Sequence, residues 1–201
     1  MLLALMYHSI SPVPPSDFWG QVISPAHFHS HLKALKANFE IADAMSGRHV
    51  DFARSKDVHV LLTIDDGYAD NLYQALPMLK HHEVPAVIML ASGFVGQRSF
   101  WWDALEALFE GCESAGTAAR RDGLQAIWAS LLDMQPAQRA LALDELRHLA
   151  GDPLLDNERR PLAEAEVAEL ARCSLISFGG HTHFHSWLPH LSIERIFQEI
   201  Q

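Results

Sequence analysis

The chain has 201 residues, of which 49% are hydrophobic and 20% charged, and this composition is typical of a globular domain with a hydrophobic core. A formal net charge of −10 argues against nucleic acid and against docking on anionic lipid, because both partners require clustered Lys and Arg. The apolar run from Met1 to Met6 is too short for a signal peptide or a membrane span, so we expect a cytoplasmic protein. Cys112 and Cys173 lie far apart without metal-ligand spacing, and we expect them to be plain thiols.

Strands in the N-terminal half are predicted from short apolar runs bounded by turn residues. The clearest is the run from Val58 to Ile64, and the runs over residues 2–6 and 86–91 have the same character. A further short strand is expected over residues 39–42. Residues 11–24 are rich in Pro and Ser and are expected to form a loop.

Two helices are predicted between these strands. The first begins at Ser24-Pro25, with the serine as N-cap and the proline in the first turn. The second spans residues 70–82, ends before Pro85, and is expected to carry Asp70 on its solvent face. The buried face of the first helix is predicted to consist of Phe28, Leu32, Leu35 and Phe39, and its solvated positions to include His27, His29 and His31.

Residues 100–172 contain no predicted strand and are expected to form a helical insertion between two strands. Apolar residues at spacings of three and four predict helices over residues 124–132, 139–149 and 163–172, and an apolar run over 174–178 predicts the next strand. Alternation of strands and helices predicts an α/β fold with parallel strands and right-handed crossovers. The C-terminal ends of such strands are where active sites of barrels form.

Two adjacent carboxylates, Asp65 and Asp66, end the clearest predicted strand, and Gly67 permits a sharp turn after them. Successive side chains in a strand point to opposite faces, so the pair cannot both face a core, whereas at the strand end both can reach a cleft. Carboxylates this close raise each other's pKa unless a cation offsets their charges. A functional site is therefore a better interpretation of the pair than two carboxylates that cap the following helix.

Three histidines follow the strand predicted over residues 174–178, namely His181, His183 and His185. One carboxylate and two imidazoles leave open positions for water around a metal ion, which suits zinc, cobalt or ferrous iron. The remaining carboxylate is then free to act as a base. This inventory predicts a metal-assisted hydrolase.

These two segments carry a family resemblance. Thr63-Ile64-Asp65-Asp66-Gly67 resembles the Thr-Phe-Asp-Asp-Gly motif of the polysaccharide deacetylases, also called the NodB-homology or carbohydrate esterase family 4 group. His181-Thr182-x-x-His185 is similar to that family's His-Ser/Thr-x-x-His motif. The resemblance implies that Asp65 is the general base and that Asp66, His181 and His185 bind one divalent metal ion, with zinc expected before cobalt. Thr182 is expected to fix the loop by hydrogen bonding, and His183 to lie outside the ligand set or to substitute within it.

Weaker matches extend the resemblance over most of the chain. Met6-Tyr7-His8, Ile23-Ser24-Pro25-x-x-Phe28 and Phe100-Trp101-Trp102-Asp103 each resemble segments of bacterial members, in the family's order. The resemblance implies a partial or distorted (β/α) barrel over residues 1–201, with a helical insertion at about 100–172.

The family's later motifs have no counterpart in the chain before Gln201. They are an Arg-x-Pro segment, a Trp- or Asp-containing segment and a Leu-His whose histidine is the general acid. We therefore expect an N-terminal portion of a deacetylase domain that binds metal but deacetylates poorly, with the acid beyond Gln201.

Four residues are candidates for binding the substrate. His8 ends the first predicted strand and either faces the barrel mouth or bonds to the backbone. Trp101 and Trp102 either stack on a sugar ring or form the hinge of the insertion. Tyr68 follows the carboxylate motif directly.

The predicted function is metal-dependent removal of N-acetyl groups from an amino-sugar polysaccharide or glycan intermediate. An alternative is a catalytically inactive carbohydrate-binding remnant that lacks the later motifs. A metallo-β-lactamase-type hydrolase is disfavoured, because His185 and Ser186 stand where its His-x-His-x-Asp-His motif requires Asp and His.

Overall fold

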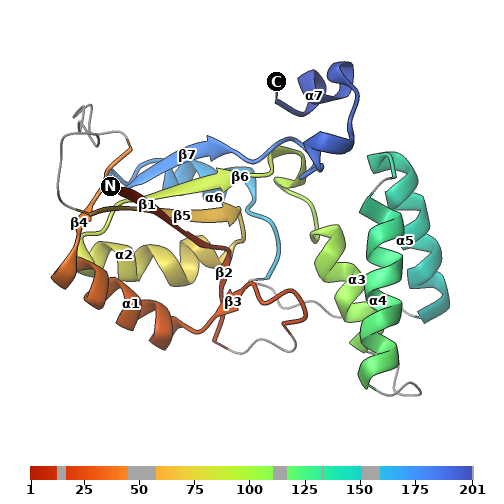
Figure 1. Cartoon of the computed structure of the whole chain (residues 1–201), viewed down its shortest axis with the longest axis horizontal. Coiled ribbons are helices and arrows are strands. Elements are labelled where there is room, and N and C mark those ends of the chain that lie inside the picture. The colour runs from red at the N-terminus through yellow and green to blue at the C-terminus, as the bar shows by residue number, and fades with distance from the viewer. Residues whose placement is uncertain (13–16, 45–57, 111–116, 133, 151–158, 201) are drawn as a thin grey trace.

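The computed structural model describes residues 1–12, 17–44, 58–110, 117–132, 134–150 and 159–200. Within these residues a parallel sheet is flanked by helices, and a second group of helices lies beside it (Figure 1). Cys173 is a free thiol, while Cys112 falls outside the described residues. None of the described helices is long and apolar enough to cross a membrane.

The sheet is built around β5 (His59–Asp66), which is buried along most of its length. β5 pairs in parallel with β1 (Leu2–Tyr7), with β4 (Glu40–Ile41) and with β6 (Ala86–Leu90), and β6 pairs with β7 (Ile176–Gly180). The predicted parallel α/β architecture is confirmed. The sheet remains open across the described residues, as expected for a partial barrel.

Two short strands lie at the ends of the predicted N-terminal loop, one just before it and one near its end. β2 (Ser9–Ile10) and β3 (Val22–Ile23) pair in parallel and fold this loop back against the end of β1. Isolated two-residue strands carry too little apolar pattern to be recognised in a sequence.

The first helix, α1 (Pro25–Asn38), begins as predicted. The Ser24 hydroxyl accepts a hydrogen bond from the backbone N–H of His27, and Pro25 occupies the first turn. The expectation for Phe39 was wrong: its side chain is 40% exposed because the backbone leaves the helix at this residue. The predicted core positions Phe28, Leu32 and Leu35 are buried, and His27, His29 and His31 are exposed.

The second helix starts with a wider turn than predicted. A π-helical segment, η1 (Asn71–Ala75), precedes α2 (Leu76–His82) and places the start of the helix inside the protein. Asp70 is therefore fully buried rather than solvated, which corrects the prediction. Its carboxylate accepts hydrogen bonds from Ser9 Oγ at 2.5 Å and Asn71 Nδ2 at 2.8 Å, and burial raises its pKa to about 7.

The insertion has a hydrophobic core of its own. The helices α3 (Trp101–Glu110), α4 (Thr117–Leu132) and α5 (Pro136–Ala150) pack together beside the sheet (Figure 1). The fourth helix of this region, α6 (Glu164–Leu170), instead contributes Leu170 to the core beneath the sheet. The last helix is α7 (Ile193–Ile200), and two short 3-10 turns, η2 (Ser92–Phe94) and η3 (Leu188–His190), complete the fold.

A buried ion-pair group joins α3 to Arg159, in the segment that leads into α6. Arg159 Nη2 lies 2.9 Å from Asp103 Oδ1 and 3.0 Å from Glu106 Oε2, and all three side chains are almost inaccessible to solvent. Glu106 Oε1 also accepts a hydrogen bond from the backbone N–H of Phe18. Because charges this deeply buried require partners, these contacts set the position of α3 relative to the strand ends.

A second polar cluster, at the start of α6, predicts a loss of stability in acid. The Glu166 carboxylate accepts hydrogen bonds from Arg160, from the Ala163 N–H and from Tyr73 Oη. The Arg160 contact is the largest cause that lowers the pKa of Glu166, to about 2. A lowered folded-state pKa favours folding above the ordinary value of 4.5, and this contribution is lost as pH falls toward 2.

Glu166→Gln is therefore expected to lower the free energy of unfolding by about 2 kcal/mol at pH 7, after allowance for solvent screening, and to flatten its dependence on pH between about 4.5 and 2. Urea unfolding at several pH values measures both effects. The exposed Glu169→Gln on the same helix is the control. Equal pH dependence in wild type and Glu166→Gln would contradict this assignment.

Candidate active site

The two carboxylates of the first motif lie at the C-terminal end of β5. Asp65 is 6% and Asp66 2% exposed, so both are buried. Asp66 has a φ of 71° and Gly67 a φ of 90°, so the chain turns through the left-handed region as it leaves the strand. Glycine adopts this φ without the strain that a side chain would bring, and a Cβ at this position would in addition displace the Leu90 side chain, whose Cδ2 it would approach to 2.5 Å.

The histidine segment follows β7 and contains two further left-handed residues, Thr182 (φ 61°) and His185 (φ 52°). Thr182 Oγ1 accepts a hydrogen bond from the Ser186 N–H at 3.1 Å, as its predicted loop-fixing role requires. The backbone N–H of His181 bonds to Leu90 O, which ties the segment to β6. Non-glycine residues held in this region of φ and ψ are characteristic of functional sites.

Three side chains from the two motifs converge. Asp66 Oδ1 lies 3.5 Å from His181 Nε2 and 3.5 Å from His185 Nε2, and the two Nε2 atoms are 3.0 Å apart. Asp65 Oδ2 lies 4.0 Å from His181 Nε2. His183 instead contacts Ser92 Oγ at 3.0 Å and stays outside the cluster. The structure thus brings together the residues that the motifs pair.

Electrostatics at this cluster favour a cation. Burial, reinforced by the charges of Asp103 and Asp65, raises the pKa of Asp66 to about 8. Burial and the charge of His181 lower the pKa of His185 to about 4. Burial therefore disfavours both the carboxylate form of Asp66 and the imidazolium form of His185. A positive ion between Asp66 and the two histidines would favour the carboxylate and the neutral imidazoles instead.

The donor set fits a divalent metal. Neither carboxylate oxygen of Asp66 has a hydrogen-bond partner among the described residues, although both are buried. Four-coordinate zinc with ligand bonds of about 2.0–2.1 Å needs ligand atoms roughly 3.3 Å apart, close to the 3.0–3.5 Å separations found here. A carboxylate and two imidazoles with space for water match a catalytic rather than a structural site.

His8 reaches this site from the neighbouring strand. Tyr7 pairs with Ile64 in the β1–β5 register, so His8 leaves β1 at the level of Asp65. The half-buried imidazole interacts electrostatically with both Asp65 and His181, and burial lowers its pKa. Its backbone carbonyl accepts a hydrogen bond from Asn71 Nδ2, so the backbone at this position is fixed.

The aromatic candidates are more buried than a sugar-stacking role suggests. Tyr68 is 1% exposed, and its hydroxyl accepts a hydrogen bond from Trp102 Nε1 at 2.9 Å, so it stabilises the core rather than meeting solvent. Trp102 packs against His185 with ring centroids 4.8 Å apart. Trp101 packs edge-on against Trp102 and lies under the guanidinium of Arg139 at 4.6 Å. Trp102 thus joins the insertion to the histidine segment, whereas the ring contacts of Trp101 lie within the insertion.

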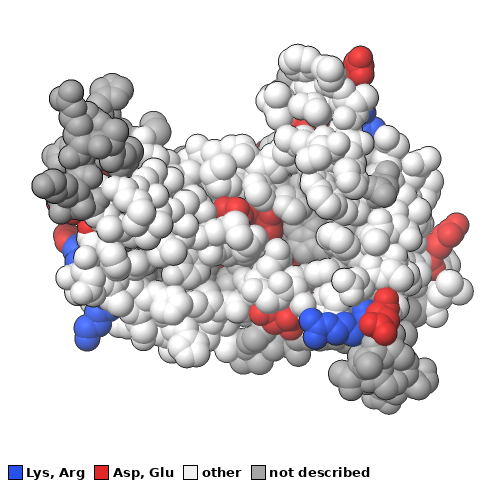
Figure 2. Space-filling model, viewed as in Figure 1, with Lys and Arg blue, Asp and Glu red and all other residues white. Residues whose placement is uncertain are grey.

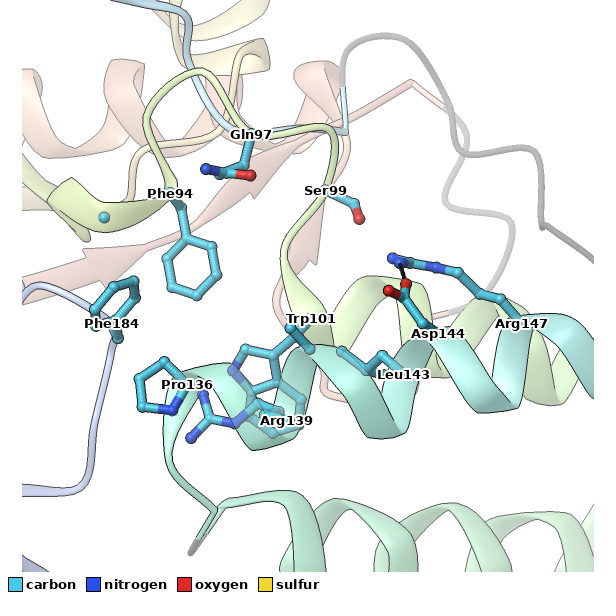
Figure 3. Close-up of a pocket in the computed structure, with 12 residues that line it drawn as sticks. Phe94, Gln97, Ser99, Trp101, Pro136, Arg139, Leu143, Asp144, Arg147 and Phe184 are labelled. Atoms are coloured by element: carbon cyan, nitrogen blue, oxygen red, sulfur yellow. Dashed lines mark hydrogen bonds and ion pairs between the residues drawn. The ribbon is translucent and has the colours of Figure 1, made fainter.

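Trp101 lines two of the cavities that adjoin the insertion. The smaller one, about 250 Å³, lies between η2 and α5, where Phe94 and Phe184 face Trp101 across it and the Asp144–Arg147 ion pair stands at the other side (Figure 3). The larger one, about 500 Å³, has His185 in its wall. In the space-filling view, acidic side chains lie in the hollow between the sheet domain and the insertion (Figure 2).

Glu199 supports the histidine segment, and no motif indicated it. This buried residue of α7 accepts hydrogen bonds from the Phe184 N–H at 2.8 Å and from Ser186 Oγ at 2.7 Å, and its backbone carbonyl accepts one from the His183 N–H. One side chain thus bonds to both neighbours of His185, to the backbone of Phe184 and to the hydroxyl of Ser186. A helix that begins eight residues after His185 carries no local sequence signal for this contact.

Replacing Glu199 by alanine is expected to weaken zinc affinity about 10- to 100-fold, because the loop that carries both histidines loses its anchor. Competition with a chelating dye measures this affinity. Gln198→Ala, an exposed position on the same helix, is the control. Unchanged affinity in a folded Glu199→Ala variant would show that the loop is held by other contacts.

Comparisons with solved structures agree with this fold. The chain superposes on a protein classed as a polysaccharide deacetylase from Bacillus anthracis with a TM-score of 0.57, 16% identity and 99% of this chain covered. A polysaccharide deacetylase from Bacillus cereus gives a TM-score of 0.53 at 17% identity, with 96% of this chain covered. A de-N-acetylase from Aggregatibacter actinomycetemcomitans gives a TM-score of 0.51 at 19% identity, with 90% of this chain covered. These matches cover 43%, 42% and 55% of the respective solved chains, so this chain spans about half their length.

The sequence itself matches a family model. Residues 53–201, which contain both motifs, match the family described as polysaccharide deacetylase. No match was found among curated proteins. Because the family model covers most of the chain and the carboxylates and histidines of its motifs meet at one strand edge, the chain belongs to the polysaccharide deacetylase family.

Proposed function

We propose that the chain hydrolyses the N-acetyl group of an amino sugar in a polysaccharide or glycan, with a divalent metal ion held by Asp66, His181 and His185. The observation that carries this proposal is the convergence of their three ligand atoms beside a second carboxylate, Asp65. Zinc fits this donor set best, with cobalt as a close substitute. When bound, the ion would supply the Lewis acidity that activates a water molecule and polarises the acetyl carbonyl.

Asp65 is proposed to be the general base. Its Oδ1 is buried without a hydrogen-bond partner among the described residues, and its Oδ2 lies 4.0 Å from His181 Nε2. Asp65 can therefore accept a proton at the edge of the ligand cluster without being a ligand itself. A water that attacks the acetyl carbon from this side would transfer its proton to Asp65.

His8 is proposed to be the general acid. Sequence analysis placed this acid beyond Gln201, but the β1–β5 register brings an imidazole to the level of Asp65 within the chain itself. When the C–N bond breaks, the nitrogen of the leaving amine needs a proton, which His8 can donate in its imidazolium form, the form that the neighbouring charge of Asp65 favours.

His8→Ala is expected to reduce kcat about 100-fold or more and to leave zinc stoichiometry unchanged, because His8 is not among the proposed ligands. His8→Gln keeps a hydrogen-bonding group without an acid and should be equally impaired. Full activity in either variant would exclude His8 as the acid and assign that role to another group of the chain or to solvent.

The reaction class is tested by acetate release from the tetramer of β-linked N-acetylglucosamine, with mass spectrometry of the product. The expected result is a product that has lost acetyl from nitrogen and gained a free amine. Release from an O-acetylated oligosaccharide alone would instead indicate an esterase. An inactive binding remnant would release acetate from neither substrate.

A further inference from the structure

Three histidines meet on the surface where α1 lies against α2 (Figure 1). His29 belongs to α1, and His81 and His82 are the last two residues of α2. His29 Nδ1 lies 3.1 Å from His82 Nε2, although the two residues are 53 positions apart in the sequence. The ring of His81 stacks on that of His29 with centroids 5.9 Å apart and meets that of His82 edge-on at 4.8 Å. Three imidazoles from two helices thus form one cluster, the imidazole group.

The imidazole group is separate from the proposed active site. α2 ends at His82, and Ala86, the first residue of β6, follows shortly after it. Asp65 and Asp66 pair instead with the last two residues of β6. The imidazole group therefore lies toward the N-terminal ends of the strands, whereas the active site lies at their C-terminal ends.

The backbone that carries these histidines is fixed by other contacts. Glu83 ends α2 in a left-handed conformation (φ 53°), and its N–H bonds to Leu79 O and Lys80 O. Lys36 of α1 donates a hydrogen bond to His82 O and pairs with the Glu83 carboxylate at 2.9 Å. The two helices are therefore joined beside the imidazole group without the use of its rings, which leaves the ring nitrogens available to a ligand.

The charges around the imidazole group favour neutral rings. Burial, followed by the charges of the neighbouring histidines and of Lys36 and Lys33, lowers the pKa of His82. A neutral imidazole keeps a lone pair on one ring nitrogen, and this is the form that binds zinc, copper and nickel. The charge of Lys36 would oppose a bound cation, but the carboxylate of Glu83 already offsets it.

The separation of the ring nitrogens suits a shared metal ion. Ligand bonds of about 2.0–2.1 Å place neighbouring nitrogens of a zinc site roughly 3.3 Å apart, close to the 3.1 Å between His29 Nδ1 and His82 Nε2. A hydrogen bond between these two rings would also explain this distance, but it leaves His81 without a role. The ring of His81 is exposed and makes only ring contacts among the described residues, so it is free to turn a nitrogen toward the pair.

We propose that His29 and His82, completed by His81, bind a second divalent transition-metal ion of the zinc class at the surface between α1 and α2. His29 would bind through Nδ1 and His82 through Nε2, each with its hydrogen on the other ring nitrogen, and water would fill the remaining positions. Because such an ion binds the folded chain, it stabilises the contact of the two helices by mass action. The inference does not rest on the proposed function, since it uses neither carboxylate nor motif histidine.

The test titrates zinc by calorimetry into a tag-free chain that carries His181→Ala, which removes the proposed active-site ion. An exposed site without a carboxylate ligand binds more weakly than one with Asp66, so its ion is lost during purification and zinc must be added. The expected result is one zinc per chain in this background and two in the wild type. Magnesium, which prefers oxygen ligands, should not bind the imidazole group.

Adding His29→Ala or His82→Ala to this background is expected to weaken zinc binding at least about 10-fold, because each change removes a ligand. His29 is exposed and alanine favours helices, so the first variant should fold normally. His27→Ala is the matched control, because His27 is an exposed histidine of the same helix whose ring contacts Ser24.

Thermal unfolding gives a second readout. Excess zinc should raise Tm of the His181→Ala chain, and this rise should be smaller when His29→Ala is added. Zinc binding that is absent from the His181→Ala chain, or that is unaffected by loss of His29 and of His82, would overturn the proposal. Neither result depends on acetate release, so failure of the deacetylase proposal would leave this test unchanged.

Discussion

Replacing His181 by alanine is expected to lower bound divalent metal from about one ion per chain to none. His181 Nε2 lies 3.5 Å from Asp66 Oδ1 and 3.0 Å from His185 Nε2, so its loss leaves only two of the three proposed ligands. Acetate release should fall by at least about 100-fold, because loss of a ligand costs more than loss of a group that merely supports one. Elemental mass spectrometry of purified protein measures the metal content without any assumption about substrate.

His183→Ala is the matched control for this change. His183 belongs to the same segment, but its ring contacts Ser92 and not the cluster, so metal content should be unchanged. If His183→Ala loses the metal and His181→Ala keeps it, the ligand assignment is wrong.

Replacing Asp65 by asparagine is expected to separate metal binding from catalysis. Asp65 lies beside the cluster and is not one of the three converging ligands, so the variant should keep about one metal ion per chain. Removal of the base should lower kcat about 100- to 10,000-fold with little change in KM. The experiment compares metal content and steady-state acetate release in the same preparation.

Asp66→Asn provides the contrast for the Asp65 variant. Asp66 Oδ1 faces both histidines, so this substitution should reduce the metal content itself. If Asp65→Asn loses the metal and Asp66→Asn retains it, then Asp65 is the ligand and Asp66 the base, the reverse of the proposed roles.

Much of the sheet domain could be predicted because its signals are local. The apolar run that became β5, and the Ser24-Pro25 start of α1, are each set by a few neighbouring residues. The carboxylates and histidines then meet because parallel strands bring their C-terminal ends to one edge, a consequence of topology alone. Sequence therefore sufficed to place Asp66 near His181.

The errors arose where long-range packing overrides local pattern. Asp70 follows the polar motif and precedes an amphipathic helix, which is the usual pattern of an exposed residue, but the π-helical turn and Ser9 of β2 enclose it. The burial of Tyr68 against Trp102 from the insertion was likewise not visible in the sequence. Neither partner is adjacent in the chain.

Residues that act across the fold were also beyond local reasoning. Glu199 bonds to the histidine segment from a helix that shows no motif. The cavity of about 500 Å³ that has His185 in its wall is lined by side chains as distant in sequence as Trp19 and Trp187. The sequence analysis named His8 as a candidate, but its position beside Asp65 follows only from the observed register of β1 and β5.

The most direct test of the central claim is acetate release by one preparation in three states: as purified, stripped of metal by a chelator, and reloaded with zinc. The substrate is the tetramer of β-linked N-acetylglucosamine. A metal-binding deacetylase centre at Asp66, His181 and His185 predicts activity that disappears on stripping and returns at about one zinc per chain. Acetate release that is the same in all three states would contradict it.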